Sequence, residues 1–255
     1  MRGPEGRAAY GRHRRNRHTF PFTLWCVPYQ EPFAIGFDLD LTLADTREGI
    51  SAVYRALSEE TGVPIDTDAV VRRIGPPLEV EIGYWFPPEQ VPEMTARYRA
   101  VYADIAIPAT AVMAGARESL EAVRALGGRV VVVSGKNQLD TERTVRHLDF
   151  PVDVVVGGLF GTDKGAALRE HRATAYVGDH LGDVDAARAA EITSVGVATG
   201  SFDVAALVDY GADVVLPDLR AFPDWLTRRY DGRNPNGHQE GRPDGYSDAV
   251  PDVRG

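Results

Sequence analysis

Short Val-rich runs alternate with amphipathic segments over residues 129–218, and this alternation constrains the fold more than any other feature of the sequence. The Val-rich runs are almost continuously apolar, which is typical of strands buried on both faces of a parallel sheet. The segments between them have the length and periodicity of connecting helices. The expected strands are 129–135, 152–158, 174–179, 193–198 and 213–218, and the expected helices are 138–148, 164–171, 184–191 and 203–211. This pattern predicts an α/β fold with a doubly wound parallel sheet.

An apolar run at 33–37 supplies one more strand, but no second strand-like run follows it before residue 129. The intervening segment has helical periodicity over 50–57 and again over 94–102. It therefore predicts a helical cap domain inserted into a doubly wound, Rossmann-like core. The predicted boundaries are 46–111 for the cap, 32–45 and 112–229 for the core, and 116–128 for a helix that leads into the second strand.

Both ends of the chain differ in composition from this core. Residues 1–31 begin Arg-rich and continue with a short apolar run that Pro21 and Pro28 interrupt. Because a small-residue cleavage site is missing, we interpret this segment as a disordered arm rather than a secretory signal. Residues 230–255 are rich in Gly, Pro and Asp and poor in large apolar groups, which predicts a disordered tail.

Charge and cysteine content exclude several classes of partner. The formal net charge of −9 argues against nucleic acid or an anionic membrane as the main partner, while a small anionic substrate remains compatible with it. No stretch approaches the roughly 18 consecutive apolar residues of a membrane span. With a single cysteine, Cys26, the chain forms no intramolecular disulfide, so a cytoplasmic location is expected. Only two of the 28 basic residues are lysines, Lys136 and Lys164, which makes both candidates for sites that need a compact ammonium.

Polar groups follow four of the expected strands. They are Asp38, Asp40 and Thr42 after the first strand, Ser134 and Gly135 at the end of the second, Lys164 at the helix after the third, and Asp179 and Asp183 after the fourth. Each group alone is explained equally well by a turn, a helix cap or a solvated charge. Because the carboxyl ends of parallel strands meet at one edge of the sheet, all four groups are expected to lie together.

The combined set suits phosphoryl transfer. A carboxylate that attacks a phosphate dianion needs a metal ion and a cation to neutralise the charge. Carboxylate and carbonyl oxygens of the kind that Mg²⁺ prefers come from Asp38, Asp40, Asp179 and Asp183, the last either directly or through water. Phosphate-binding groups are Thr42, Ser134, Gly135 and Lys164, with main-chain N–H groups at the start of the next helix. Asp40 is then left as the general acid and base.

These residues resemble the four motifs of the haloacid dehalogenase (HAD) superfamily, and most closely its phosphoglycolate-phosphatase branch. The matching segments are "FDLDLTLADT", "VVVSGK", Lys164 and the highly specific "VGDHLGDVDAARAA", and the likeness extends over residues 33–226. The resemblance implies that Asp38 is the nucleophile and Asp40 the acid/base. It also implies that Thr42 supports the first motif, that Ser134 and Lys164 bind phosphate, and that Asp179 and Asp183 hold Mg²⁺. The expected partner is a small phosphorylated metabolite.

The sequence departs from the family pattern at two positions where the family usually has glycine, Leu41 and Glu191. Leu41 is expected to alter the turn after the first strand or the floor of the pocket. His180 occupies a variable position where it can face either the site or solvent, and we favour the solvent-facing interpretation. None of these departures removes a catalytic group.

Absences narrow the activity within the superfamily. Residues 46–111 contain neither lysine nor histidine, whereas the phosphonate hydrolases use a cap lysine and the hexose-phosphate mutases typically have a histidine soon after the first motif. Metal-free dehalogenases do not pair Asp40 with Asp179 and Asp183, and a receiver-type signalling domain is shorter and has no second carboxylate. A phosphatase is therefore the favoured activity. A non-catalytic phosphate-sensing or scaffold protein of the same fold stays open, and a phosphomutase is less favoured.

The cap is expected to choose the substrate. The segment "IGPPLE", residues 74–79, resembles a loop that lies over the active site in this branch of the superfamily. Candidate contacts are Arg72, Arg73 and the turn at 75–77, although a solvated helix face is the favoured explanation of the two arginines. The aromatic run at 84–86 is better explained as part of the interior of the cap.

Overall fold

The computed structural model describes residues 33–230. The predictions of disorder for 1–31 and for 230–255 lie outside the described residues, except at Tyr230, which is helical. The single cysteine also lies outside them. Among the described helices, none combines the length and apolar character that a membrane crossing requires.

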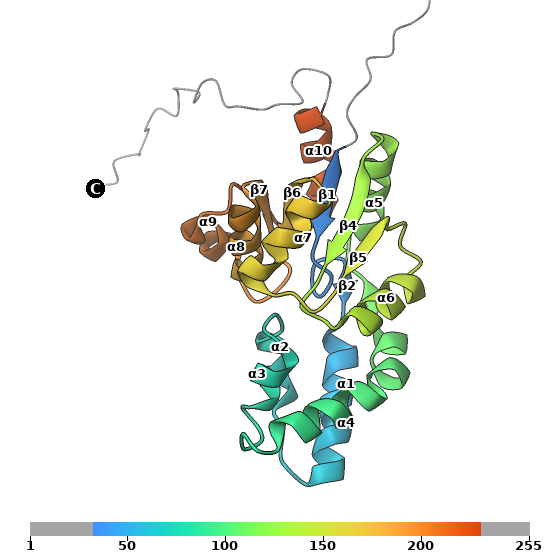
Figure 1. Ribbon diagram of the computed structural model, residues 1–255, viewed down its shortest axis with the longest axis vertical. Helices are drawn as coiled ribbons and strands as arrows, with labels where there is room; N and C mark the ends of the chain where they lie inside the picture. The colour runs from blue at the N-terminus through green and yellow to red at the C-terminus, as the bar shows by residue number, and fades with distance from the viewer. Residues whose placement is uncertain (1–32, 231–255) are drawn as a thin grey trace, which may run out of the picture. The chain divides into compact units, whose positions relative to one another are not determined.

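A six-stranded parallel sheet forms the centre of the fold, in the order β5-β4-β1-β6-β7-β8 (Figure 1). The chain runs outward from β1 through β4 to β5 and then returns to the other side of β1 to lay down β6, β7 and β8. The strands are β1 (Ala34–Phe37), β4 (Arg129–Val133), β5 (Val154–Val156), β6 (Ala173–Gly178), β7 (Thr193–Val197) and β8 (Val214–Leu216). The predicted doubly wound α/β fold is thereby confirmed.

Alternate residues of the central strands enter two separate hydrophobic clusters. In β4, Val130 and Val132 pack on one face with helices α5 (Ala116–Ala125) and α10 (Phe222–Tyr230). Val131 and Val133 pack on the other face with α7 (Lys164–Glu170) and α8 (Leu181–Ala190). Because both faces are covered, neither set of side chains meets water, and the strand is apolar throughout. The remaining helices of this part of the chain are α6 (Gln138–His147) and α9 (Val204–Tyr210).

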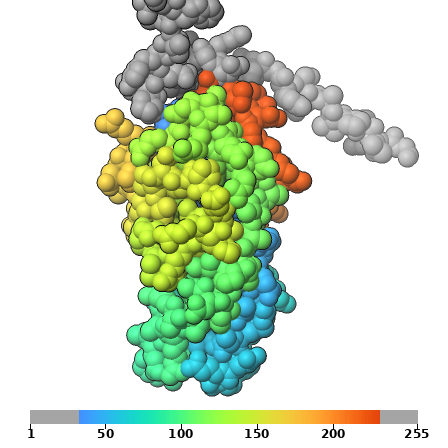
Figure 2. All heavy atoms as spheres, turned by 90° about the vertical axis from the view of Figure 1, so that its right-hand side faces the viewer, coloured from blue at the N-terminus to red at the C-terminus, as the bar shows by residue number. Residues whose placement is uncertain are grey.

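Between β1 and β4 the chain makes the predicted helical insertion. Its helices are α1 (Arg47–Thr61), α2 (Thr67–Arg72), α3 (Leu78–Ile82), α4 (Val91–Ile105) and the short 3₁₀ helix η1 (Ile107–Ala109). They share a hydrophobic cluster of their own, which includes Tyr54, Ile82, Met94 and Tyr98. On the face shown in Figure 2, the insertion contacts the rest of the chain where α6 meets α4 and η1.

A two-stranded antiparallel ribbon, which the sequence analysis missed, brackets the insertion. It pairs β2 (Ala44–Asp45) with β3 (Ala111–Val112), at the two points where the chain enters and leaves the helices. A two-residue strand is too short to show any periodicity, so the sequence carries no signal for it. The exact domain boundaries remain a prediction.

Several elements end elsewhere than expected. Helix α8 begins at Leu181, three residues earlier than predicted, because the His180 ring and the Asp183 carboxylate cap its first turn reciprocally. Helix α5 stops at Ala125 instead of continuing to 128, since the chain turns at Gly127 with φ 77°. Strands β5 and β8 are shorter than their Val-rich runs, and helix α10 was not predicted.

Candidate active site

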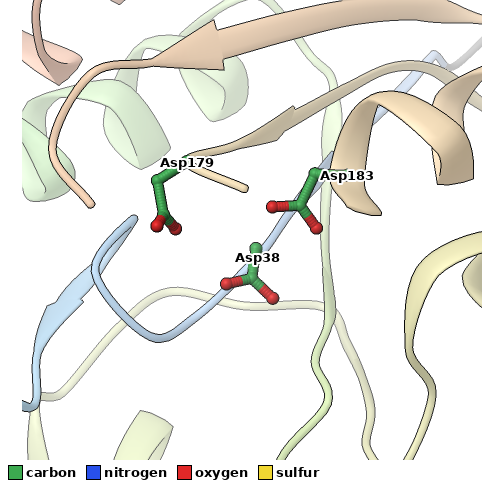
Figure 3. Close-up of side chains that lie close together, drawn as sticks. All are labelled: Asp38, Asp179 and Asp183. Atoms are coloured by element: carbon green, nitrogen blue, oxygen red, sulfur yellow. The ribbon is translucent and has the colours of Figure 1, made fainter. Parts of the chain in front are cut away.

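Three carboxylates lie together at the carboxyl edge of the sheet. Asp38 follows β1, Asp179 follows β6, and Asp183 lies in the first turn of α8 (Figure 3). All three are buried, and each offers an oxygen within 4.8 Å of the oxygens of the other two. The strand order places β1 beside β6, which is why residues far apart in the sequence converge here.

Lys164 joins two of these carboxylates. Its ammonium lies 2.7 Å from Asp38 Oδ1 and 2.7 Å from Asp183 Oδ1, and it donates a third hydrogen bond of 2.9 Å to the Tyr176 hydroxyl. Tyr176 in turn donates a hydrogen bond to the Val133 carbonyl on β4, which holds its hydroxyl in place beside the lysine. With 3% of its surface exposed, Lys164 is a buried cation whose position is set by three partners.

Close packing around the carboxylates leaves no room for larger neighbours. Thr42 donates a 2.8 Å hydrogen bond to Asp179 Oδ1 and orients that side chain. A Cβ atom at Gly200 would lie 1.8 Å from Asp179 Oδ2, and one at Gly178 would lie 2.2 Å from Asp183 Oδ2. Both glycines are thus part of the site, and the sequence analysis missed them because the requirement arises from tertiary contacts.

Burial and mutual repulsion make the charged forms of the carboxylates costly. The pKa of Asp38 is raised to about 7, chiefly by burial, with Lys164 acting in the opposite direction and Asp183 and Asp40 adding to the rise. Burial, followed by the charges of Asp38 and Asp183, also raises the pKa of Asp179. A divalent cation would relieve this repulsion, and its preferred hard oxygen ligands are present. The triad therefore fits a metal ion.

A cavity above the triad is lined by residues from both the sheet edge and the helical insertion. Of the predicted site residues, Asp38, Asp40, Ser134, Gly135, Lys164, Asp179 and Asp183 line it. Thr42 is fully buried behind Asp179 and is not among the lining residues. The structure thus brings seven of the eight predicted residues to one cavity and places the eighth directly behind it.

Lys136, the second of the two lysines, pairs with Asp40. Its ammonium lies 2.8 Å from Asp40 Oδ1 and 2.5 Å from the hydroxyl of Tyr102 on α4. Burial works against the charged form of Lys136, but Asp40 and Tyr102 outweigh it, and the pKa of this lysine is raised. The sequence analysis singled out Lys136 by its rarity but assigned it no role, because a partner on the insertion is not visible in the sequence.

Both positions where the resemblance predicts glycine have left-handed backbone conformations. Leu41 has φ 60° and is 2% exposed, and Glu191 has φ 57° at the end of α8. Residues with a Cβ atom adopt this region at an energetic cost. The chain therefore keeps the backbone that glycine permits without having the glycine.

His180 does not face solvent, so that interpretation was wrong. It lines the cavity, and its ring packs on Phe160 and Phe202. Its Nδ1 accepts a hydrogen bond from the Gly182 N–H. Gly75 of the insertion is so close that a Cβ atom there would lie 2.6 Å from His180 Cδ2. Capping of α8 turns the ring towards the insertion.

The candidate contacts of the insertion separate into two groups. Arg73 lines the cavity, as do Gly75 and Pro76 of the predicted loop. Arg72 is exposed and does not line it. The aromatic run at 84–86 also lies outside the cavity lining, and Phe86 is buried in the hydrophobic cluster of the insertion.

Comparisons with known proteins agree with the site. Residues 35–160 match the haloacid dehalogenase-like hydrolase family, and residues 161–222 match the related HAD-hydrolase-like family. The chain is 28% identical over 187 residues to the tyrosine-protein kinase PtkA of Mycobacterium tuberculosis, covering 68% of this chain and 64% of that protein. It is 26% identical over 219 residues to the phosphoglycolate phosphatase of Chromobacterium violaceum, covering 76% of this chain and 96% of that protein. The chain thus spans 64% of the length of the mycobacterial relative.

Solved structures share the fold. A haloacid dehalogenase-like hydrolase from Streptococcus pneumoniae superposes with a TM-score of 0.69 at 22% identity, covering 76% of this chain and 98% of that one. The chain belongs to the haloacid dehalogenase-like hydrolases. Two curated phosphatases are among the relatives of this chain, and its buried acidic triad suits a metal ion.

Proposed function

We propose that the chain is a Mg²⁺-dependent phosphatase that hydrolyses a small phosphorylated metabolite through an aspartyl-phosphate on Asp38. The observation that carries the proposal is the contact of Asp38 with the buried ammonium of Lys164, beside Asp179 and Asp183, on the wall of a cavity that Asp40 also lines. A carboxylate held against a cation in this way can approach a phosphate dianion that would otherwise repel it.

In the first step an Asp38 oxygen attacks the phosphorus atom and the bond to the alcohol oxygen breaks. Asp40 donates its proton to the departing oxygen, which leaves as the free alcohol. In the second step Asp40 takes a proton from water, whose oxygen attacks the same phosphorus. The bond between phosphorus and Asp38 then breaks, releasing inorganic phosphate and restoring both carboxyl groups.

The remaining site residues stabilise charge and hold the phosphoryl group. Lys164 neutralises negative charge on the nucleophile and on the phosphoryl oxygens, and Ser134 and Gly135 offer a hydroxyl and a main-chain N–H. Asp38, Asp179 and Asp183, with the main-chain carbonyl of Asp40, would hold Mg²⁺. The bound metal supplies positive charge to the phosphoryl oxygens. Thr42 keeps Asp179 in place for this.

The names of the relatives support transfer of a phosphoryl group but differ in the acceptor of that group. Two of them are phosphoglycolate phosphatases, and the mycobacterial proteins are tyrosine-protein kinases. Water as the acceptor is favoured because Asp40 lines the cavity together with Asp38 and can serve as a base for a water molecule there. A cytoplasmic location and the absence of nucleic acid partners stay predictions from composition.

The test is a panel of phosphorylated metabolites assayed for phosphate release with Mg²⁺, with EDTA and with Asp38→Asn. We expect turnover only with Mg²⁺ and the intact carboxylate. Asp209→Asn is the matched control, since Asp209 is an exposed aspartate on α9, outside the cavity lining. Mass spectrometry of acid-quenched enzyme should find one added phosphoryl group on the peptide that contains Asp38.

Each alternative predicts a different result. A scaffold protein would release no phosphate from any ester, and a mutase would return an isomeric ester instead of phosphate. A kinase would move the phosphoryl group of ATP to a tyrosyl peptide. Turnover that survives EDTA or the loss of the Asp38 carboxylate would refute the mechanism.

A further inference from the structure

The part of the cavity that faces the insertion is predominantly apolar and aromatic. Its wall is formed by Ile50, Tyr54, Val70, Ile74, Leu78 and Tyr98. These side chains come from α1, α2, α3, α4 and the loop between α2 and α3. Because the phosphoryl group is held at the sheet edge, this wall meets the alcohol part of the substrate. Its composition therefore determines which alcohols fit.

Every cation on the lining already has a carboxylate partner. The Arg73 guanidinium makes two bonds to Glu81, of 2.9 and 2.6 Å. Arg99 bonds to Glu79 at 2.7 Å, and Lys136 lies 2.8 Å from Asp40. The fourth cation, Lys164, is paired with Asp38 and Asp183 of the triad. Each lysine and arginine among the described lining residues is thus already paired with a carboxylate, and of these pairs Arg99–Glu79 is the exposed one.

A negatively charged alcohol part would be poorly accommodated. To gain Arg73, a substrate carboxylate would have to displace Glu81, whose side chain is only 10% exposed and also accepts a hydrogen bond from Trp85. The displaced carboxylate would be left buried without its partner, which is strongly unfavourable. If Glu81 stayed in place, the two anions would repel each other.

One buried group on the same wall lacks a partner. The Tyr54 hydroxyl has no hydrogen-bond partner among the described residues, and the residue is 1% exposed. Buried hydroxyl groups are almost always hydrogen-bonded, so a polar group of the substrate that reaches this one can complete it. An uncharged hydroxyl on the substrate fits, since it can donate or accept.

We propose that the substrate is the phosphate ester of an uncharged, largely apolar or aromatic alcohol that carries a further hydroxyl group. Phosphorylated carboxylic acids, including phosphoglycolate, are excluded from the preferred class. This inference rests on the proposed phosphatase activity and adds the chemistry of the alcohol part.

The experiment compares kcat/KM for three esters that differ at one remote group. They are benzyl phosphate, 4-(hydroxymethyl)benzyl phosphate and 4-carboxybenzyl phosphate, with 2-phosphoglycolate as a fourth substrate. We expect the carboxylated ester to be hydrolysed about 10-fold less efficiently than benzyl phosphate, and the hydroxymethyl ester about 5-fold more efficiently, as one added neutral hydrogen bond allows. Phosphoglycolate is expected to be the poorest substrate.

Two variants connect these preferences to their residues. Glu81→Gln leaves Arg73 without its anion, so the ratio of carboxylated to plain ester should rise about 10-fold. Tyr54→Phe should abolish the advantage of the hydroxymethyl ester. Because each readout is a ratio of two substrates on one protein, a general loss of folded enzyme cancels. Glu93→Gln is the matched control, since it breaks an exposed ion pair with Arg97 outside the cavity lining and should leave both ratios unchanged.

Three outcomes overturn the inference. Equal or better hydrolysis of the carboxylated ester, or of phosphoglycolate, refutes the substrate class while leaving the phosphatase activity intact. Unchanged ratios in Glu81→Gln and Tyr54→Phe refute the assignment of the preferences to this wall. No hydrolysis of any ester with Mg²⁺ refutes the proposed function and this inference together.

Discussion

Leu41 lies in the turn after β1, and two substitutions there test its backbone conformation. Alanine variants of buried residues are usually more stable than glycine variants, and at Leu41 we expect the reverse. Its φ is 60°, its N–H donates to the Ala44 carbonyl at 2.8 Å, and its carbonyl accepts from the Thr199 hydroxyl at 2.6 Å. These contacts hold a left-handed conformation that costs a residue with a Cβ atom about 1–2 kcal/mol. The leucine side chain, 2% exposed, offsets that strain by its burial.

The two substitutions separate strain from burial. Leu41→Ala loses the buried side chain but keeps the strain, so it should lower the free energy of unfolding by about 3 kcal/mol. Leu41→Gly loses the same side chain and relieves the strain, while glycine's greater freedom in the unfolded chain takes back about 0.5–1 kcal/mol. We therefore expect the glycine variant to be about 1 kcal/mol more stable than the alanine variant.

Urea unfolding followed by circular dichroism measures this difference. Leu120 is the matched control, because it is equally buried but lies inside helix α5. There the alanine variant should be the more stable by about 1 kcal/mol. If Leu41→Ala is as stable as Leu41→Gly, the left-handed conformation of the loop is wrong.

Two further predictions follow from the same structure. Glu191→Gly should raise the free energy of unfolding by about 1 kcal/mol and the melting temperature by about 2–4 °C, because Glu191 is exposed at φ 57° and its replacement relieves backbone strain. Glu191→Ala keeps the strain and should change stability little. Equal effects of the two substitutions in a thermal melt would contradict this. Lys136→Met leaves the Asp40 carboxylate without its cation, so kcat with Mg²⁺ should fall about 100-fold, whereas Tyr102→Phe, which removes one hydrogen bond from the lysine, should lower it less than about 10-fold. Wild-type turnover by Lys136→Met would show that the pair has no part in catalysis.

The fold was predictable where the sequence of a single strand is enough to determine the surroundings of its residues. The uninterrupted apolar run from Val130 to Val133 indicates a strand covered on both faces, because a polar residue at any of these positions would be buried at a cost. The same reasoning placed Asp38, Ser134, Lys164 and Asp179 at one edge, since parallel strands end together. Those inferences need no knowledge of what packs on the sheet.

The rest depends on contacts between distant segments. The hydrogen bond of Lys136 to Tyr102 joins the sheet edge to the insertion, and nothing in the sequence marks it. His180 turns inward because it caps α8 and meets Gly75, and nothing in its local sequence marks this. Arg73 is a candidate substrate contact by its position in the sequence, but in the structure Glu81, eight residues further on, neutralises its charge.

The ribbon of β2 and β3 has a consequence for how such an enzyme changes in evolution. The chain leaves for the insertion at Ala44 and returns at its partner Val112, so the two ends of the inserted segment lie side by side. A different segment with equally close ends can replace it without moving any strand of the sheet. Under the proposed function, the residues of phosphate release and those that choose the alcohol therefore lie on two separable modules. Lys136, which contacts both Asp40 and Tyr102, is where a different insertion would have to be matched to the sheet edge.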